Sequence, residues 1–419
     1  MTYETGLKLK SKSLLSLLFI LNTLAFAQDV ILKSLKAYTA GDETSLPVIY
    51  YSMEGGGNNI TIEFDIEAEF IPGLNVVFRF CDKDWKPTGN NFLINYGKNI
   101  AYFLDFITLP NTVEEAQYRF KGNFPSDFTD VEFPFSGKWM FFITESNDTS
   151  IVYGTGKFFV VHEEVSLKTA IKNEQLEDKS YFPADLAKVF NVTSEFNLPD
   201  ELTPAFISHI EIIENQKISN PVIVNREFNT NQRQYYWDGS SKFSFTARDI
   251  QPGNEYRQAD LRNINVFNSK NVKSQFDGIE YSRFFKDAPD DLNGGSVLTN
   301  YRDEFATYLN VTFSIRPPDE IMGNIFLVGA FNNWQLLPEY EMANNTGLYT
   351  KTVPLKRGIY DYQYVLADVI NGKIKNENWL ILEGNNWQTT NVYHVFLYYN
   401  DPNYGGYDKV IGYSKIMSR

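Results

Sequence analysis

Histidines, cysteines and close pairs of carboxylates are the residue types that most often carry chemistry, and in this chain they are scattered. His162, His209 and His394 lie far apart, in runs expected to form strands of three different domains. A metal site or catalytic triad needs such side chains within bonding distance of partners. Cys81, the single cysteine, has no histidine nearby and is expected to be a buried structural thiol. These residues indicate neither a catalytic nor a metal centre.

The segment CDKDWKPTGN at residues 81–90 superficially resembles an acidic calcium loop, because Asp82 and Asp84 precede a Gly-Asn pair. A calcium loop of the EF-hand type continues to a glutamate that is missing here, and Trp85 and Pro87 occupy positions where ligands would be needed. We therefore interpret the segment as a turn held by Asx-type hydrogen bonds, and expect no metal or cofactor. A glycosidase-type carboxylate pair stays open, because its separation is a three-dimensional property.

The elements that would position any site are short runs of alternating residues. Residues 59–68 (NITIEFDIEA) place Ile60, Ile62, Phe64 and Ile66 on one face, and Thr, Glu and Asp on the other. This period of two predicts a half-buried antiparallel strand, and similar runs recur along the chain. Aromatic residues reach 16%, which also suits pleated, half-buried surfaces. The sequence predicts an all-β protein.

Breaks in this pattern suggest the domain organisation. A polar stretch at 172–180 and a charged stretch rich in Gly and Pro at 287–295 separate the runs. Strands at such spacing with turn residues between them are typical of β-sandwiches. We expect three consecutive sandwiches of the Ig-like or E-set kind, at 28–164, 165–304 and 305–419.

The first 27 residues have the composition of a secretory signal peptide. Three lysines precede an apolar run at 14–24, and a small-x-small cleavage site follows at 25–27. The run is too short to span a bilayer, so we expect cleavage after Ala27. An exported chain with one cysteine cannot form an internal disulfide, so its hydrophobic cores must hold it together.

The net charge argues against nucleic acid as a partner. The whole chain carries −14, and removing residues 1–27 takes away three lysines and one glutamate, which leaves −16. Such a chain repels phosphate backbones and anionic membrane surfaces, and no Lys/Arg cluster offsets this. We expect neither nucleic-acid binding nor membrane insertion.

The phrase FLVGAFNNWQ at 326–335 suggests a sugar-binding module. Residues 306–399 resemble the E-set sandwich of glycogen-binding modules such as that of the AMP-activated kinase β-subunit. The resemblance implies that Trp334 stacks on a sugar ring and that Trp387 or Trp379 supplies a second platform. Yet the family's basic position falls on Gln363, and both candidate partners lie beyond a lengthened loop. Because aromatic rings in sandwiches usually bury, we interpret Trp334 as scaffold and keep sugar binding as the alternative.

A wider resemblance covers nearly the whole chain after the signal peptide. CDKDWKP (81–87), QYYWDG (234–239), GNEYRQAD (253–260) and EGNNWQTTNVYHVFLYYNDP (383–402) occur in that order, ahead of Ile-Gly-Tyr at 411–413. Their joint order resembles the type IX secretion system plug protein family of the Bacteroidota. Tyr256 departs from the family, in which Phe is usual.

This resemblance implies a periplasmic, non-enzymatic protein without a cofactor. It would seat against the periplasmic mouth of a giant outer-membrane barrel translocon and close it while the lateral exit is open. We expect a rigid row of three sandwiches, monomeric on its own, whose acidic charge could steer it onto a basic rim. Its interface should be reversible, with a polar rim and aromatic anchors.

Two interpretations of the motif residues stay open. In the first, the aromatic residues and the arginine contact the partner. In the second, the polar residues fix turns or domain junctions through bonds to the backbone. The residues concerned are Asp82, Asp84, Trp85, Trp237, Asn254, Glu255, Tyr256 and Arg257.

Two other functions compete with the plug. One is an exported carbohydrate-binding protein that uses Trp334 and Trp387. The other is an exported hydrolase with an accessory sandwich, which requires two carboxylates converging in a cleft.

Overall fold

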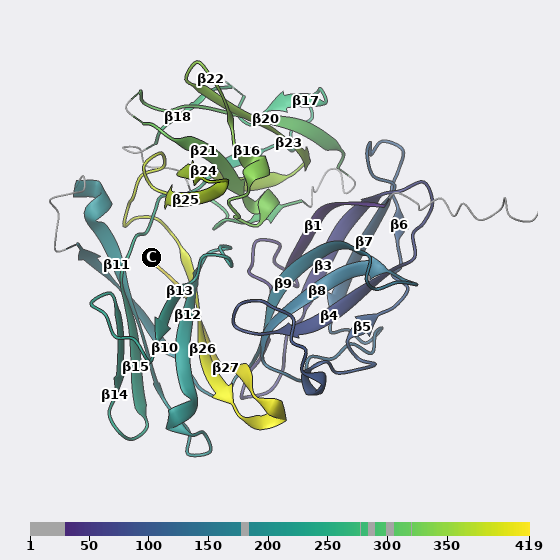
Figure 1. Ribbon diagram of the computed structural model, residues 1–419. Coiled ribbons are helices and arrows are strands. Elements are labelled where there is room, and N and C mark those ends of the chain that lie inside the picture. Colours follow the sequence, from purple (N-terminus) through teal and green to yellow (C-terminus); the bar gives the residue numbers. More distant parts are fainter. Residues whose placement is uncertain (1–29, 177–183, 277, 284–289, 299–305, 320) are drawn as a thin grey trace, which may run out of the picture.

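The computed structural model describes residues 30–419, apart from 177–183, 277, 284–289, 299–305 and 320 (Figure 1). The expected signal peptide therefore lies outside the described residues. The described chain forms β-strands and short 3-10 helices without any α-helix, which confirms the all-β prediction. In this part of the chain, no helix has the length and apolar character needed to cross a bilayer.

The N-terminal sandwich consists of an antiparallel sheet and a mixed sheet, which enclose one aromatic core. Its strands alternate, so that Phe64, Phe78, Trp139 and Phe158 point inward and are buried. The first sheet has the order β1 (Ile31–Thr39), β3 (Ile60–Glu67), β7 (Tyr118–Phe124), β6 (Ile107–Thr108). The second has the order β2 (Val48–Tyr51), β9 (Val152–His162), β8 (Gly137–Glu145), β4 (Leu74–Cys81), β5 (Ile100–Ala101).

The middle sandwich is built from two distant parts of the chain. One sheet has the order β10 (Lys168–Gln175), β11 (Lys188–Asn197), β15 (Lys242–Ile250), β14 (Arg233–Trp237). The other has the order β13 (Val222–Asn225), β12 (Ile207–Glu214), β26 (Val392–Asp401), β27 (Tyr407–Met417). Strand β12 pairs with β26 along nearly its whole length. The last two strands of the chain therefore complete this sandwich.

A third sandwich is inserted between β15 and β26, and we call it the inserted sandwich. One of its sheets contains β16 (Arg257–Asp260), β24 (Ile359–Ile370), β19 (Ser296–Val297), β21 (Asn324–Gly329) and β25 (Lys373–Asn378). The other contains β17 (Asn271–Lys273), β20 (Tyr308–Arg316), β23 (Leu348–Lys356), β22 (Ala343–Asn345) and β18 (Glu280–Tyr281). Strand pairing thus crosses the boundary expected between 165–304 and 305–419, because strand β12 of the former segment pairs with strand β26 of the latter.

In the part of the chain that the structure describes, six short 3-10 helices lie in connections between strands. They are η1 (Asn91–Leu93), η2 (Ala184–Ala187), η3 (Pro204–Phe206), η4 (Ala330–Asn332), η5 (Pro338–Tyr340) and η6 (Asn403–Gly405).

The three sandwiches are grouped around a common centre instead of standing in the expected row (Figure 1). The N-terminal sandwich contacts both of the others. The Glu114 N–H donates to Thr307 Oγ1 of the inserted part at 3.0 Å, and Gln216 Nε2 of the middle sandwich donates to the Thr44 carbonyl at 2.6 Å. The middle and inserted sandwiches also touch, because Asn215 Nδ2 donates to the Tyr256 hydroxyl at 3.0 Å. Each pair of sandwiches therefore shares a junction, and these junctions hold most of the motif residues.

Candidate functional site

A buried ion pair joins the N-terminal and middle sandwiches. Lys138 of β8 places its Nζ 2.8 Å from Glu211 Oε2 of β12, and both side chains are almost fully buried. The same ammonium donates to the Lys83 carbonyl at 2.8 Å. Next to the pair, the rings of Phe159 and Phe396 stack with centroids 4.2 Å apart. Charges removed from water are tolerated only when paired and hydrogen-bonded, as they are here.

The 81–87 motif forms a turn beside this ion pair. Asp82 Oδ1 accepts the N–H groups of Asp84 and Lys86, each at 2.9 Å, which is Asx-turn chemistry. The turn places Trp85 at φ 62°, with its half-buried ring 5.1 Å from Phe159 and 5.0 Å from Lys138 Nζ. Trp85 therefore wedges into the junction. Among the residues that the structure describes, no group of three or more His, Cys, Asp or Glu side chains could hold a metal ion.

A second buried charge cluster joins the N-terminal and inserted sandwiches. Asp65 of β3 accepts from Arg119 Nε at 2.9 Å, from Lys356 Nζ at 2.7 Å and from the Tyr308 hydroxyl at 2.9 Å. The expectation that β3 is half-buried was wrong, because the inserted sandwich covers its polar face. Asp65 is only 1% exposed.

The 253–260 and 383–402 motifs lie side by side where the chain enters and leaves the inserted sandwich. The Gly253 N–H donates to Asn385 Oδ1 at 3.0 Å, and the Asn386 N–H donates to the Gly253 carbonyl at 2.7 Å. Asn254 Nδ2 donates to the Glu383 carbonyl at 2.9 Å. Two motifs far apart in sequence therefore form one crossing between sandwiches.

Arg257 is the central charge of this crossing. Its Nε donates to both oxygens of Glu383 at 3.0 and 2.9 Å, and its Nη1 donates to Glu280 Oε1 at 2.9 Å. Tyr256 is buried beside it, with its ring centroid 4.3 Å from that of Trp334 and its hydroxyl accepting from Asn215 Nδ2 at 3.0 Å. These side chains bind one another inside the molecule, so their atoms are not exposed to a partner.

Three further carboxyl groups, those of Glu255, Asp291 and Asp361, lie at the same crossing. Glu255 Oε1 accepts the Thr390 N–H of the returning chain at 2.7 Å. Asp361 Oδ2 accepts the N–H groups of Leu292 and Gly294 at 2.7 and 2.9 Å. Burial raises the pKa of Glu255 to about 7 and that of Asp361 to about 8, and in each case the nearby carboxyl of Asp291 adds to the rise.

These raised values predict that the protein becomes less stable as the pH rises. A folded state that keeps its carboxyl protonated binds more protons than the unfolded chain, so stability falls between pH 4.5 and about 7 for Glu255. We expect Glu255→Gln to reduce the loss by about 1–2 kcal/mol, after allowance for solvent screening. Urea unfolding at pH 5, 6, 7 and 8 measures the slope, and exposed Glu54→Gln is the control. Parallel profiles for Glu255→Gln and the unmodified chain would contradict the prediction.

The remaining motif tryptophans lie at separate places. Trp334 is 2% exposed, and its Nε1 donates to the Gly294 carbonyl at 2.7 Å. Trp387 packs on the core of the middle sandwich, where its Nε1 donates to the Val189 carbonyl at 3.1 Å. Trp237 of β14 stacks on Phe243 of β15 and packs on the same core as Trp387. The suggested sugar platform fails because Trp334 has no free face. Trp379 packs on the cluster that contains Trp334, and Trp387 belongs to another sandwich.

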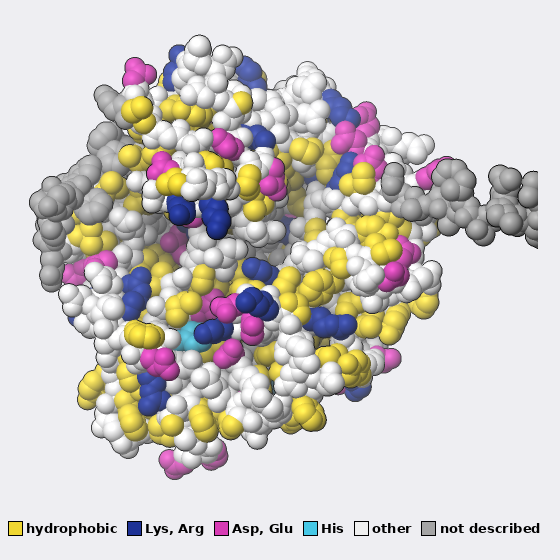
Figure 2. All heavy atoms as spheres, viewed as in Figure 1, with side chains coloured by type: hydrophobic (Ala, Val, Ile, Leu, Met, Phe, Trp, Pro, Cys, Tyr) yellow, Lys and Arg dark blue, Asp and Glu magenta, His cyan; other side chains and the backbone are white. Residues whose placement is uncertain are grey.

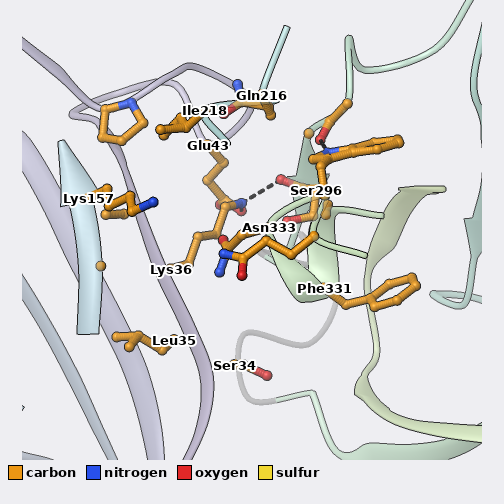
Figure 3. A pocket seen from close by; sticks show the side chains of 18 of the residues that line it. Ser34, Leu35, Lys36, Glu43, Lys157, Gln216, Ile218, Ser296, Phe331 and Asn333 are labelled. Carbon is orange, nitrogen blue, oxygen red and sulfur yellow. Dashed lines mark hydrogen bonds and ion pairs between the residues drawn. The ribbon is translucent and has the colours of Figure 1, made fainter. Parts of the chain in front are cut away.

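A cavity of about 360 Å³ lies where all three sandwiches meet (Figure 3). Lys36 of the N-terminal sandwich reaches across it, with Nζ 2.5 Å from the Ser296 carbonyl and 3.5 Å from Glu43 Oε2. Glu43 Oε2 also accepts the Leu298 N–H at 2.8 Å, so this pair fastens the N-terminal sandwich to the inserted one. Burial lowers the pKa of Lys36 despite the neighbouring Glu43.

The histidines do not converge on a site, although two of them share a sheet. His209 in β12 and His394 in β26 belong to the middle sandwich and not to different domains. Burial lowers the pKa of His209 to about 4 and that of His394 to about 3, so both rings are neutral at physiological pH.

Sequence reasoning singled out Arg257 and Trp85 but missed the charges that accompany them. Glu383 lay within a quoted motif without being selected, whereas Lys138, Glu211 and Asp65 were not selected at all. A usable signal was present in KWMFFIT and in HIEII, where a single charge stands among apolar residues of one strand. Such a charge needs a buried partner if both faces of the strand are covered.

Comparison with known proteins finds a shared fold without a named function. A hypothetical protein from Parabacteroides merdae ATCC 43184 has a crystal structure that aligns with a TM-score of 0.74 and 22% identity, over 93% of this chain and 98% of that chain. At this identity the similarity concerns the fold alone. The full-length major pilin RrgB of Streptococcus pneumoniae aligns with a TM-score of 0.13, a value too low to indicate a shared fold. No family model and no curated protein matches.

Proposed function

We propose that this protein is a periplasmic plug that closes the periplasmic mouth of the type IX secretion translocon, a giant outer-membrane barrel. The order of its motifs resembles that of the plug family, and a protein from Parabacteroides, a genus of the Bacteroidota, has a similar fold. In this proposal the protein acts without catalysis and without a cofactor. It prevents leakage by filling the opening while the lateral exit is open.

The observation that carries the proposal is the joining of three sandwiches into one body through buried charges. Lys138–Glu211 fastens the N-terminal to the middle sandwich, and the Asp65 cluster fastens it to the inserted one. Arg257 and Glu383 join β16 to the segment that follows β25, on the inserted side of the crossing. A body that closes a wide aqueous opening must not deform, and buried, hydrogen-bonded pairs favour one defined arrangement.

The motif residues support the same proposal in an indirect way. Most of them form hydrogen bonds in turns and junctions, as Asp82 and Arg257 do, and these bonds preserve the shape of the plug. Their resemblance across a family then reflects a required shape. The contact with the translocon must be made by other, exposed residues.

Deleting the gene is expected to make the outer membrane permeable to large hydrophilic dyes severalfold above the parent strain. The leak should disappear when the translocon gene is deleted as well, because the open pore is its cause. Dye entry into intact cells measures the effect, and the tagged chain should recover the giant barrel from detergent-solubilised outer membranes. An intact barrier together with no such barrel in the recovered fraction would refute the function.

A further inference from the structure

The N-terminal sandwich exposes a group of large apolar side chains at one open edge of its second sheet. Their exposed fractions run from 57% for Tyr102 to 78% for Phe103. An exposed apolar group of this kind on a soluble domain usually marks an interaction site. We call it the aromatic edge, and it consists of Phe70, Ile71, Phe92, Tyr96, Tyr102 and Phe103.

Backbone bonds to β4 bring these side chains from three loops to the same edge. The Leu104 N–H donates to the Leu74 carbonyl at 3.2 Å, which holds the Tyr102–Phe103 loop against the start of β4. Phe70 and Ile71 lie just before that start. Further along, the Phe78 N–H donates to the Asn99 carbonyl at 2.8 Å, and the loop before Asn99 carries Tyr96 and Phe92.

Strand β5 ends its sheet, so one side of its backbone has no strand partner among the described residues. In Figure 1 it lies at the outer side of the N-terminal sandwich, and Figure 2 shows hydrophobic patches over this sandwich. The Phe92 end of the aromatic edge adjoins the middle sandwich, because Asn90 Nδ2 donates to the Tyr404 carbonyl at 2.6 Å. Proteins normally protect such an edge with charge or proline. At this edge aromatic side chains occupy the positions where charged residues or proline are usual. Aromatic residues are the type enriched as anchors in protein interfaces.

The charge around the aromatic edge indicates the kind of partner. The loops at 68–73, 91–106 and 126–132 contain five carboxylates and a single cation, Lys98. That lysine lies 2.6 Å from Glu132 Oε1, so the rim is acidic overall. Aromatic anchors of membrane surfaces are accompanied by basic residues that attract anionic lipid, which this rim would repel. An apolar protein surface with a basic rim complements both features.

We propose that the aromatic edge is the surface that docks onto the translocon mouth, against an apolar patch bordered by Lys or Arg. This assignment rests on the function proposed above. Aromatic residues at the centre supply most of the binding energy, and the acidic rim speeds the encounter. Because the contact includes exposed charges, it weakens as salt increases, which suits a plug that must leave.

The test compares an edge variant, Phe92→Ser with Phe103→Ser, with a control, Phe228→Ser with Phe276→Ser. All four side chains are at least 68% exposed, so both variants should keep the melting temperature of the unmodified chain. Each tagged chain is incubated with solubilised outer membranes, and the barrel is identified by mass spectrometry. We expect the edge variant to recover at most about one-tenth of the barrel recovered by the control, because two anchor residues are lost.

The possible results distinguish a wrong docking surface from a wrong function. Equal recovery by the edge variant and the control would overturn the docking surface while the proposed function stands. No barrel with the unmodified chain would overturn the function, and the docking surface with it. Binding to vesicles of anionic phospholipid that is lost in the edge variant would assign the surface to the membrane instead, and would also overturn the proposal.

Discussion

Replacing Arg257 by alanine is expected to lower the free energy of unfolding by about 3–5 kcal/mol, because it leaves the buried Glu280 carboxylate without its cation and removes the bidentate bond to Glu383. Glu383 and Glu280 both contact the guanidinium, at 2.9 Å to Nε and Nη1 respectively. Burial alone would lower the pKa of Arg257, yet the two carboxylates more than reverse this and raise its pKa. The guanidinium is therefore fully charged. Arg283 Nε lies 3.4 Å from Glu383 Oε2 and would still face that carboxylate, so Glu280 is the carboxylate that loses its cation.

Urea unfolding followed by tryptophan fluorescence measures this loss. Arg262→Ala is the matched control, because Arg262 pairs with Asp260 at the surface and should change stability by less than about 1 kcal/mol. Arg257→Lys should fall between the two, since it keeps the charge but loses the bidentate bond. A loss for Arg257→Ala no larger than that of the control would show that the crossing does not depend on this ion pair.

Replacing Lys138 by alanine is expected to cost a similar amount, about 3–5 kcal/mol, and to act on one junction. Glu211 would remain fully buried without its ammonium partner, and the Lys83 carbonyl would lose its donor. We expect the N-terminal sandwich to unfold separately, so that a single calorimetric transition becomes two.

A double variant distinguishes loss of the charge pair from loss of packing. Lys138→Met with Glu211→Leu removes both charges and keeps most of the volume, so it should recover most of the stability. Lys172→Ala is the surface control, because Lys172 pairs with Glu174 while 77% of its side chain is exposed. A double variant as unstable as Lys138→Ala would mean that the apolar contacts, and not the unpaired charge, cause the loss.

The strands were predictable because alternation is a local signal. Ile60, Ile62, Phe64 and Ile66 alternate along β3, and all four are buried as the pattern predicts. The pattern could not show that the opposite face is buried too. Asp65 faces the inserted sandwich, a contact made by residues more than 240 positions further along the chain.

Which strands pair with each other was harder to predict from the sequence. The residues of β12 and β26 carry no mark that assigns them to each other, because any apolar strand of suitable length satisfies the same alternation. The resemblance of residues 306–399 to glycogen-binding modules also assigned most of β26 to the third expected domain. Only the three-dimensional register, with Ile213 opposite His394, reveals that β26 completes the middle sandwich.

The candidate residues were predictable in type but not in role. Arg257 and Tyr256 stand out because they belong to a recognisable motif, whereas their burial depends on Glu280, Trp334 and Glu383 from other elements. Conversely, Phe103 and Phe92 carry no motif and read as ordinary core residues. Their exposure follows from the sheet ending at β5, which the sequence does not mark.

The insertion between β15 and β26 also sets the order in which the molecule can mature. The first strands of the middle sandwich are made early, yet β12 has no neighbour on one side until Val392 and the residues after it have emerged. Such long-range closure is slow and leaves an unpaired strand open to aggregation in the meantime. A nascent or shortened chain would therefore depend on chaperones, and only a chain made through β27 could complete the middle sandwich.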